Sequence, residues 1–171
     1  LIRLAVVTGT HGLRGEIKLR SVSPDSSALN GLKQLYIRDK KGSVRLCRLK
    51  KMSIHKTVPH LMLEGYDEIS SAGALVGAEV LAAVEDFPPR TDGSFYWAEL
   101  EGMTVVDRRL GVIGTLADIF TTAAHGVYVV EGRYGEVLLP AVAPFIVNVD
   151  TGMRKINVDL PDGLVPEVDD V

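Results

Sequence analysis

The feature that most constrains the fold is an interruption near the middle of the chain. Two consecutive prolines, Pro88 and Pro89, precede a Thr-Asp-Gly sequence at residues 91–93. Proline cannot continue a strand or a helix and Asp-Gly favours a turn, so we expect a linker here. The 171 residues would then form two small domains, each with a modest core. The expected parts are a first domain at 1–88, a linker at 89–94, a second domain at 95–163 and an acidic tail at 164–171.

Short apolar runs separated by turn residues predict β-structure in both halves. In residues 16–20, alternation puts Ile17 and Leu19 on one face and charged side chains on the other, as in a half-buried strand. One helix is expected at residues 67–76, ended by Gly77. The other expected strands lie at 1–7, 34–38, 44–49, 53–55, 61–63, 79–82, 103–106, 112–120, 127–130, 136–139, 146–149 and 155–160. This pattern favours an all-β fold of two small barrels in tandem, the second of them antiparallel.

Charge is distributed unevenly along the chain. The composition is that of an ordinary soluble globular protein, with 46% hydrophobic and 24% charged residues. The net charge of −3 conceals a basic start, with thirteen Lys and Arg against three Asp and Glu in residues 1–56. Residues 89–171 instead carry six basic and thirteen acidic residues. This distribution suits a basic face for an anionic polymer and an acidic face for a basic partner. The alternative is that each charged surface only keeps its domain in solution.

Cysteine content and hydropathy predict a cytoplasmic protein. Cys47 is the single cysteine, so no disulfide framework is expected, as is typical of a reducing compartment. No apolar run approaches the roughly twenty residues that span a membrane. The first residues lack the cleavage region of a signal peptide, and without a Met at the start we expect a few residues to precede Leu1. Nothing in the sequence requires more than a monomer.

The sequence favours a protein that is not an enzyme and holds neither a metal nor a cofactor. The single cysteine and the four histidines offer no zinc-binding spacing. His55 and His60 are the nearest pair, and we expect both to be ordinary surface histidines without ligand partners. Neither a phosphate-binding Walker loop nor a Gly-x-Ser-x-Gly nucleophile motif is present.

Basic residues of the first half predict a nucleic-acid surface. The glycine-rich stretch 9–15 is expected to connect two strands tightly and to expose His11 and Arg14. Lys18 and Arg20 fall on the exposed face of the strand that follows. Further basic residues of this half are Lys33, Arg38, Lys40, Lys41, Arg45, Arg48, Lys50 and Lys51. Because no row of stacking aromatics accompanies them, RNA would be bound through its phosphates and its shape.

Three adjacent aromatics follow the linker. Consecutive residues cannot all face one side of a strand or helix, so at least one of Tyr96 and Trp97 is expected to be partly exposed. An exposed amphipathic aromatic there would suit a partner surface. The alternative is that the aromatics form a hydrophobic plug between the two domains, and Phe95 fits this alternative as well as it fits a partner surface.

Three sequence motifs resemble one known family, the ribosome maturation factor RimM family. They are THGLRGEIK at residues 10–18, FYWAELEGMTV at 95–105, and a closing stretch with LLP at 138–140 and KINV at 155–158. The order and spacing of the motifs are similar to the family's across almost the whole chain. Two departures are AAHG at 123–126, where the family often has a Gly-Ala-Asn-Asp turn, and Glu99, where aspartate is commoner.

The resemblance implies a six-stranded N-terminal barrel like those of translation factors, followed by a PRC-type barrel. It also implies a non-enzymatic assembly factor that binds the free small ribosomal subunit (30S) and helps its head, the 3′ domain of 16S rRNA, to mature. The implied protein partner is the nineteenth small-subunit protein, a basic protein of the head. Tyr96 and Trp97, with Glu99 beside them, would take part in subunit binding. The alternatives are a small β-barrel enzyme or ligand binder, and a PRC-barrel adaptor without RNA contact.

Overall fold

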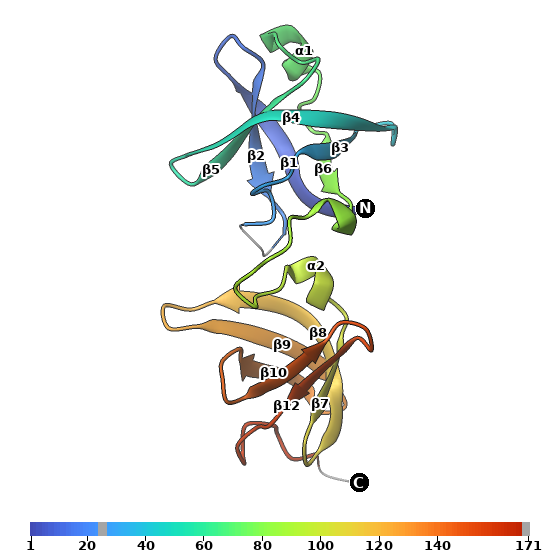
Figure 1. The fold of residues 1–171 in the computed structure, drawn as a ribbon, viewed down its shortest axis with the longest axis vertical. Helices are drawn as coiled ribbons and strands as arrows, with labels where there is room; N and C mark the ends of the chain where they lie inside the picture. Colours follow the sequence, from blue (N-terminus) through green and yellow to red (C-terminus); the bar gives the residue numbers. More distant parts are fainter. Residues whose placement is uncertain (24–26, 169–171) are drawn as a thin grey trace. The chain divides into compact units, whose positions relative to one another are not determined.

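The chain divides into two compact units, Leu1–Ser94 and Phe95–Val171, in a computed structural model that describes residues 1–23 and 27–168 (Figure 1). The finer division of the first unit into a domain at 1–88 and a linker at 89–94 stays a prediction. Leu164 and Val165 pack on the core of the second unit, so the chain is anchored up to this point. The last part of the expected acidic tail, residues 169–171, lies outside the described residues.

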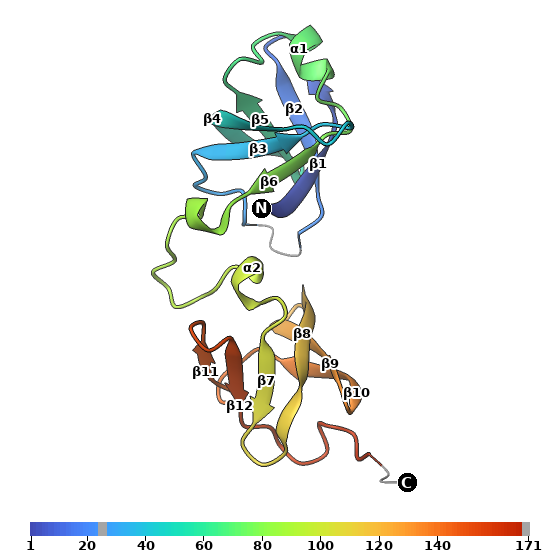
Figure 2. The same cartoon turned by 90° about the vertical axis from the view of Figure 1, so that its right-hand side faces the viewer.

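The first unit is a closed barrel of six antiparallel strands in the order β1-β2-β5-β4-β3-β6 (Figures 1 and 2). Its strands are β1 (Ile2–His11), β2 (Glu16–Ser21), β3 (Gln34–Arg38), β4 (Val44–His55), β5 (Val58–Leu63) and β6 (Glu79–Ala82). The alternation expected in β2 is present, with Ile17 and Leu19 almost fully buried. β1 runs further than expected because a bulge between Val7 and Gly9 lets it pass the first glycine.

The helix of the first unit, α1 (Ile69–Gly73), is shorter than the sequence pattern predicts. Glu68 is extended and caps the helix, and the hydroxyl of Ser71 donates to the Glu68 carbonyl at 2.9 Å. At the other end the N–H groups of Leu75 and Val76 bond three residues back rather than four, which closes the last turn. A short 3-10 helix, η1 (Val84–Asp86), follows β6.

The second unit is a six-stranded sheet in the order β10-β9-β8-β7-β12-β11. Its strands are β7 (Thr104–Asp107), β8 (Gly111–Thr121), β9 (Gly126–Gly132), β10 (Gly135–Pro140), β11 (Ile146–Asp150) and β12 (Lys155–Val158). The all-β expectation is therefore confirmed. The expectation of purely antiparallel pairing is wrong, because β12 pairs with β7 in parallel. The chain between these two strands supplies the long crossover that parallel neighbours need.

A second helix, α2 (Trp97–Leu100), begins the second unit and was not expected from the sequence. The carboxylate of Glu99 accepts the backbone N–H of Tyr96 at 2.7 Å, which caps the helix. Trp97 and Leu100 are buried from α2 and join the core of this unit. Within the described ranges, no helix is long and apolar enough to cross a membrane.

A buried carboxylate connects the ends of the parallel pair. Asp107, only 2% exposed, accepts the N–H groups of Arg109 and Leu110 at 2.9 Å and that of Leu160 at 3.0 Å. Burial raises the pKa of Asp107, but the N–H groups that donate to the ionised form outweigh it and the pKa lies below its usual value. The charged side chain thus holds the turn after β7 against the chain that leaves β12.

Replacing Asp107 by Asn should lower the free energy of unfolding by about 1–3 kcal/mol at neutral pH, because one N–H acceptor becomes a donor. Since the pKa is depressed in the folded state, the contribution of Asp107 is present above the unfolded pKa and is lost as the pH falls through the folded pKa. Urea unfolding of the full chain should therefore show a smaller difference in unfolding free energy between the unchanged protein and the Asp107→Asn variant at about pH 3 than at pH 7. Asp159→Asn, which removes a partner of Arg108 at 3.6 Å on the surface, is the control and should change stability little. Equal effects of the two substitutions would contradict this role.

Gly15 should not tolerate a side chain. Its φ is +73°, and a Cβ atom there would lie 1.8 Å from the carbonyl oxygen of Tyr66. Gly12, with φ +65° and nothing within 4 Å of such an atom, is the matched control. Gly12→Ala should cost about 1–2 kcal/mol from its backbone conformation alone. Gly15→Ala must also displace backbone, so we expect at least about 3 kcal/mol in denaturant unfolding, or failure to fold. Similar costs for the two variants would exclude the close approach.

Candidate functional site

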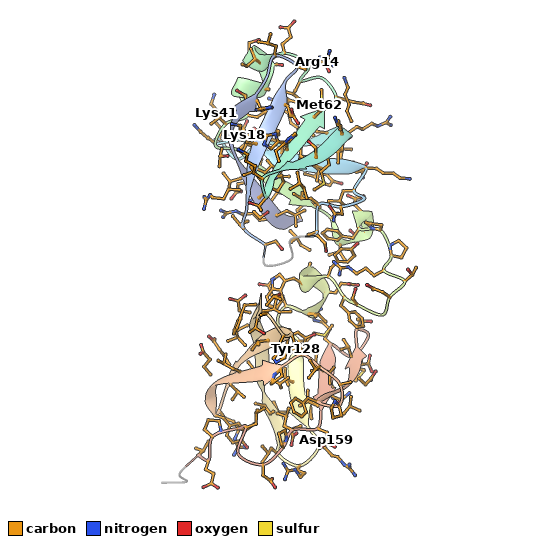
Figure 3. All side chains as sticks on the ribbon, turned by 90° about the vertical axis from the view of Figure 1, so that its left-hand side faces the viewer. Arg14, Lys18, Lys41, Met62, Tyr128 and Asp159 are labelled. Carbon is orange, nitrogen blue, oxygen red and sulfur yellow. The ribbon has the colours of Figure 1, made fainter. Side chains whose placement is uncertain are left out.

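The residues predicted to bind RNA lie on the β1–β2 hairpin of the first barrel. His11 ends β1 directly opposite Glu16, and Lys18 pairs with Gly9 beyond the bulge. Arg14 lies in the turn between the strands, where it is exposed (Figure 3). Lys18 is half-buried and Arg20 is exposed. The structure therefore brings all four predicted residues onto one hairpin, as the sequence predicts.

The basic residues of this barrel differ in whether a carboxylate neutralises them. Arg38 pairs with Glu79 at 3.0 Å, and Lys50 pairs with Asp67. In contrast, Arg14, Lys18 and Arg20 have no ion-pair partner within residues 1–23 and 27–168. Their positive charge is thus available to a ligand, whereas much of the charge of the paired residues is already compensated.

An apolar side chain lies beside the positive charges of the hairpin. Leu13, adjacent to Arg14 in the turn, is 80% exposed. A large apolar side chain at the end of a hairpin contributes nothing to the core of its own barrel. Single exposed apolar residues are common, so the exposure of Leu13 alone does not indicate a binding surface. It supports one only together with the unpaired charges around it.

Of the two histidines expected to be ordinary surface residues, His55 is exposed and His60 is buried. The rings of His11, His55 and His60 cluster, with centroids 4.6 Å apart for His55 and His60 and 5.1 Å apart for His11 and His60. His60 is only 3% exposed. Leu61 faces the core, so His60 lies on the outer face of β5, where neighbouring side chains cover it. The expectation of surface exposure is wrong for His60 because nothing local in the sequence shows this cover.

Glu16 lies beside the histidine cluster. Its Oε1 atom accepts the hydroxyl of Ser53 at 3.1 Å and lies 3.6 Å from Nδ1 of His60. Nε2 of His55 lies 3.9 Å from the same oxygen and 3.2 Å from the Ser53 hydroxyl oxygen. For His60, the expectation that no possible ligand partners lie near is therefore wrong as well.

The surroundings of His60 favour its neutral form. Burial lowers the pKa of its ring, and the carboxylate of Glu16 only partly opposes this. The two other histidines and Lys18 lower it further. Although Nδ1 of His60 is buried, it has no hydrogen-bond partner within the described part of the chain.

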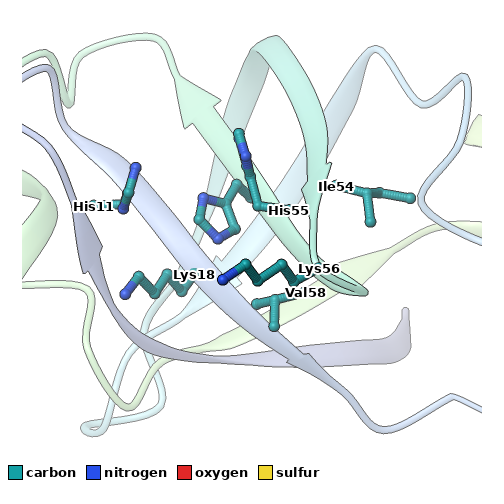
Figure 4. A pocket seen from close by; sticks show the side chains of 7 residues that line it. His11, Lys18, Ile54, His55, Lys56 and Val58 are labelled. Carbon is teal, nitrogen blue, oxygen red and sulfur yellow. The ribbon is translucent and has the colours of Figure 1, made fainter.

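An open pocket of about 630 Å³ adjoins this cluster (Figure 4). The residues that line it are His11, Lys18, Ile54, His55, Lys56, Val58 and His60. The end of β4 and the start of β5 thus form one side of the pocket, and the β1–β2 hairpin forms the other. Two ammonium groups and three imidazoles line it, so its walls are polar and basic.

The aromatic segment is more buried than the sequence predicts. Tyr96 is 7% exposed and Trp97 is 9% exposed, so the expectation that at least one is partly exposed is wrong. That expectation assumed a single strand or helix, whereas Tyr96 is extended and Trp97 begins α2. The change of backbone conformation lets neighbouring side chains be buried together. Glu99 is half-buried and caps α2.

Acidic side chains are exposed on the strands of the second unit. Glu131 and Glu136 lie directly opposite each other on β9 and β10, and both are exposed. Across the described residues, neither forms an ion pair. Like charges directly opposite on a sheet destabilise it. The Glu131–Glu136 pair therefore does not contribute to the stability of the second unit.

Comparison with known proteins identifies both units. The RimM N-terminal domain model matches residues 2–87, and the RimM PRC barrel domain model matches residues 97–164. Ribosome maturation factor RimM of Syntrophotalea carbinolica is 47% identical over 98% of this chain and 95% of its own length. The corresponding protein of Trichlorobacter lovleyi is 38% identical over 91% of each chain.

A solved structure is similar over most of its length. It is a crystal structure described as a 16S ribosomal RNA processing protein RimM of Pseudomonas aeruginosa, 26% identical, covering 94% of this chain and 97% of that one with a TM-score of 0.46. The family models and the two close relatives are enough to confirm the resemblance noted in the sequence. The chain belongs to the RimM family of ribosome maturation factors.

Proposed function

We propose that this protein is a non-enzymatic assembly factor that binds the free 30S subunit in the cytoplasm and promotes maturation of its head and processing of its 16S rRNA. Membership of the RimM family supports a role in ribosome maturation. The observation that carries the finer proposal is the unpaired charge on each unit, positive on the first and negative on the second. Such surfaces suit a particle made of RNA and basic proteins.

The β1–β2 hairpin of the first barrel is the proposed RNA-binding element. Arg14 and Arg20 are exposed guanidinium groups without ion-pair partners in the described chain, so phosphates can approach them without displacing a carboxylate. His11 and Lys18 extend the same surface toward the pocket. Leu13 beside them adds an apolar contact that orients the hairpin. Contacts of this kind bind RNA through its shape and backbone.

The acidic strands of the second unit are the proposed contact for the nineteenth small-subunit protein, the basic partner expected in the head. Glu131 and Glu136 repel each other across β9 and β10 in the free protein. A lysine or arginine of the partner would relieve that repulsion on binding. The free energy of this relief adds to the attraction between the two proteins.

The segment with Tyr96, Trp97 and Glu99 also belongs to the proposed subunit-binding region. Because Trp97 is part of the core, its effect on binding would come through the position of α2. Truncating a buried tryptophan typically costs about 3–5 kcal/mol of stability, so loss of binding in such a variant would not by itself identify a contact. The charged surfaces therefore offer the clearer tests.

Such a factor would act by binding one conformation of the rRNA more tightly than another. A difference of about 3 kcal/mol between the two affinities changes the ratio of the conformations more than a hundredfold. The protein would leave once the matured subunit no longer presents the same surface. This mechanism requires no catalytic residue.

The RNA contact is tested by co-sedimentation with isolated small subunits and with assembled ribosomes at several salt concentrations. About six phosphate contacts would give a log–log slope of affinity against salt near −4 to −5. In Arg14→Gln with Arg20→Gln, binding should weaken and the slope should become shallower by about 1.4–1.8, as two phosphate contacts are lost. Arg38→Gln, whose partner Glu79 retains Arg3 at 3.1 Å, is the control and should change the slope less.

Binding to the free subunit but not to the assembled ribosome is the expected result for the unchanged protein. A salt response that is flat in every variant would instead favour an adaptor without RNA contact. Failure to bind either particle at low salt would overturn the proposed function.

The protein contact is tested with Glu131→Gln and Glu136→Gln together. Because the substitutions remove repulsion across the strands, stability should be unchanged or should rise by a few tenths of a kcal/mol, about the size of one cross-strand pair. Affinity for the purified basic head protein should nevertheless fall about tenfold. Asp118→Gln, an exposed carboxylate on β8 that pairs across the sheet with Val129, is the matched control. Unchanged affinity in the double variant would exclude this surface.

A further inference from the structure

Three potential metal ligands converge from three strands of the first barrel. His11 ends β1, Glu16 begins β2, and His60 lies on β5. Each can offer one ligand atom, and these atoms all lie within 4.8 Å of one another. His11 faces Glu16 directly across the β1–β2 ladder, and the pairing of Lys18 with His60 places His60 diagonally from Glu16. The sheet itself therefore sets the arrangement of the three groups.

An unpartnered buried nitrogen points to a missing ligand. Nδ1 of His60 belongs to a side chain that is only 3% exposed and, within residues 1–23 and 27–168, has no hydrogen-bond partner. Oε1 of Glu16 lies 3.6 Å from it. Buried polar atoms are nearly always satisfied, and an ion is one of the accepted explanations when the protein itself does not satisfy them.

The distances fit a shared cation. Two ligands bound to a tetrahedral zinc ion at about 2.0–2.1 Å lie about 3.3–3.4 Å apart. The separation of 3.6 Å between His60 and Glu16 is close to this value. No separation in the group exceeds 4.8 Å, and His11, which is exposed, can rotate to bring its ring closer to the other two groups.

We propose that His11, Glu16 and His60 bind a transition-metal dication, with zinc(II) the best match, on the outer wall of the first barrel. Two imidazoles and a carboxylate are ligands that zinc and its neighbours prefer, whereas magnesium and calcium prefer all-oxygen sites. His55, whose Nε2 lies 3.9 Å from the same Glu16 oxygen, can rotate to supply a fourth ligand. Otherwise the fourth position opens to the pocket.

The main competing occupant of this pocket is an inorganic anion. Lys18 and Lys56 line it together with the three histidines, and their charge opposes a cation (Figure 4). However, an anion bound to His55 and His60 would approach the Glu16 carboxylate, whose Oε1 atom lies 3.9 Å from the first ring and 3.6 Å from the second. It would also leave the carboxylate and the His60 nitrogen without a common partner. The geometry therefore favours the cation, and the lysines are placed to attract an anionic group to the open position of the metal.

The proposal is tested on the full chain with zinc(II) and cobalt(II) salts alone. We expect one equivalent of zinc by calorimetry, the visible absorption typical of four-coordinate cobalt, and a rise in the melting temperature with added zinc. His11→Gln and Glu16→Gln should each weaken binding at least about tenfold and abolish the rise in melting temperature. His11 is exposed, so its replacement leaves the core of the barrel intact. His125→Gln, the histidine of the second unit, is the matched control and should bind like the unchanged protein.

Three results would overturn the site. One is an unchanged protein that gives neither one-equivalent zinc binding nor the cobalt spectrum. Another is zinc binding that survives unchanged in both His11→Gln and Glu16→Gln, which would indicate adventitious surface binding. The third is saturable binding of inorganic phosphate to the metal-free protein, lost in Lys18→Gln, together with no zinc binding. None of these measurements uses ribosomes, so the metal site can fail while the proposed function stands.

Discussion

The close approach of Gly15 to the Tyr66 carbonyl is the constraint on which the proposed RNA-binding face of the first barrel depends. With no side chain at residue 15, the turn of the β1–β2 hairpin can lie against the chain that follows β5. This fixes where β2 begins and therefore which of its residues face outward. A shift by one residue would exchange the buried set, Ile17 and Leu19, with the exposed set. The basic face and the histidine cluster both follow from this register.

The two units rely on separate cores and carry opposite surface charge. One hydrophobic cluster lies wholly within the first barrel and the other wholly within the second unit. A chain of this kind can vary the surface of one unit without disturbing the packing of the other. The ion pairs also divide the basic residues of the first unit into two groups. Arg38 and Lys50 are held by carboxylates of their own barrel, while the hairpin arginines are left to a ligand.

Local patterns in the sequence predicted the strands well and the contacts between them poorly. β3 and β6 have the expected bounds, because in each case alternation or a short apolar run is bracketed by turn residues. The parallel pairing of β12 with β7 joins residues about fifty positions apart, and the periodicity of a short sequence segment cannot predict such a pairing. The same holds for the cover over His60, which comes from β1, β2 and β4. The position of Trp97 was missed for another reason. Glu99 caps a helix of only four residues, too short to show a helical period.

A carboxylate in the middle of the basic surface proposed to bind RNA requires an explanation, and charge connects the two proposals. Glu16 lies two residues before Lys18 on β2, and its Oε1 atom lies 3.6 Å from Nδ1 of His60, so its charge weakens the attraction of this face for phosphates. Its hydrogen bond with Ser53 accounts for one oxygen but does not remove its charge. A bound dication would reverse the sign of the local charge and direct an open coordination position toward the pocket lined by Lys18 and Lys56. Glu16 would then belong to the basic face, because the ion it holds would extend the positive surface from Arg14 to the pocket without interruption.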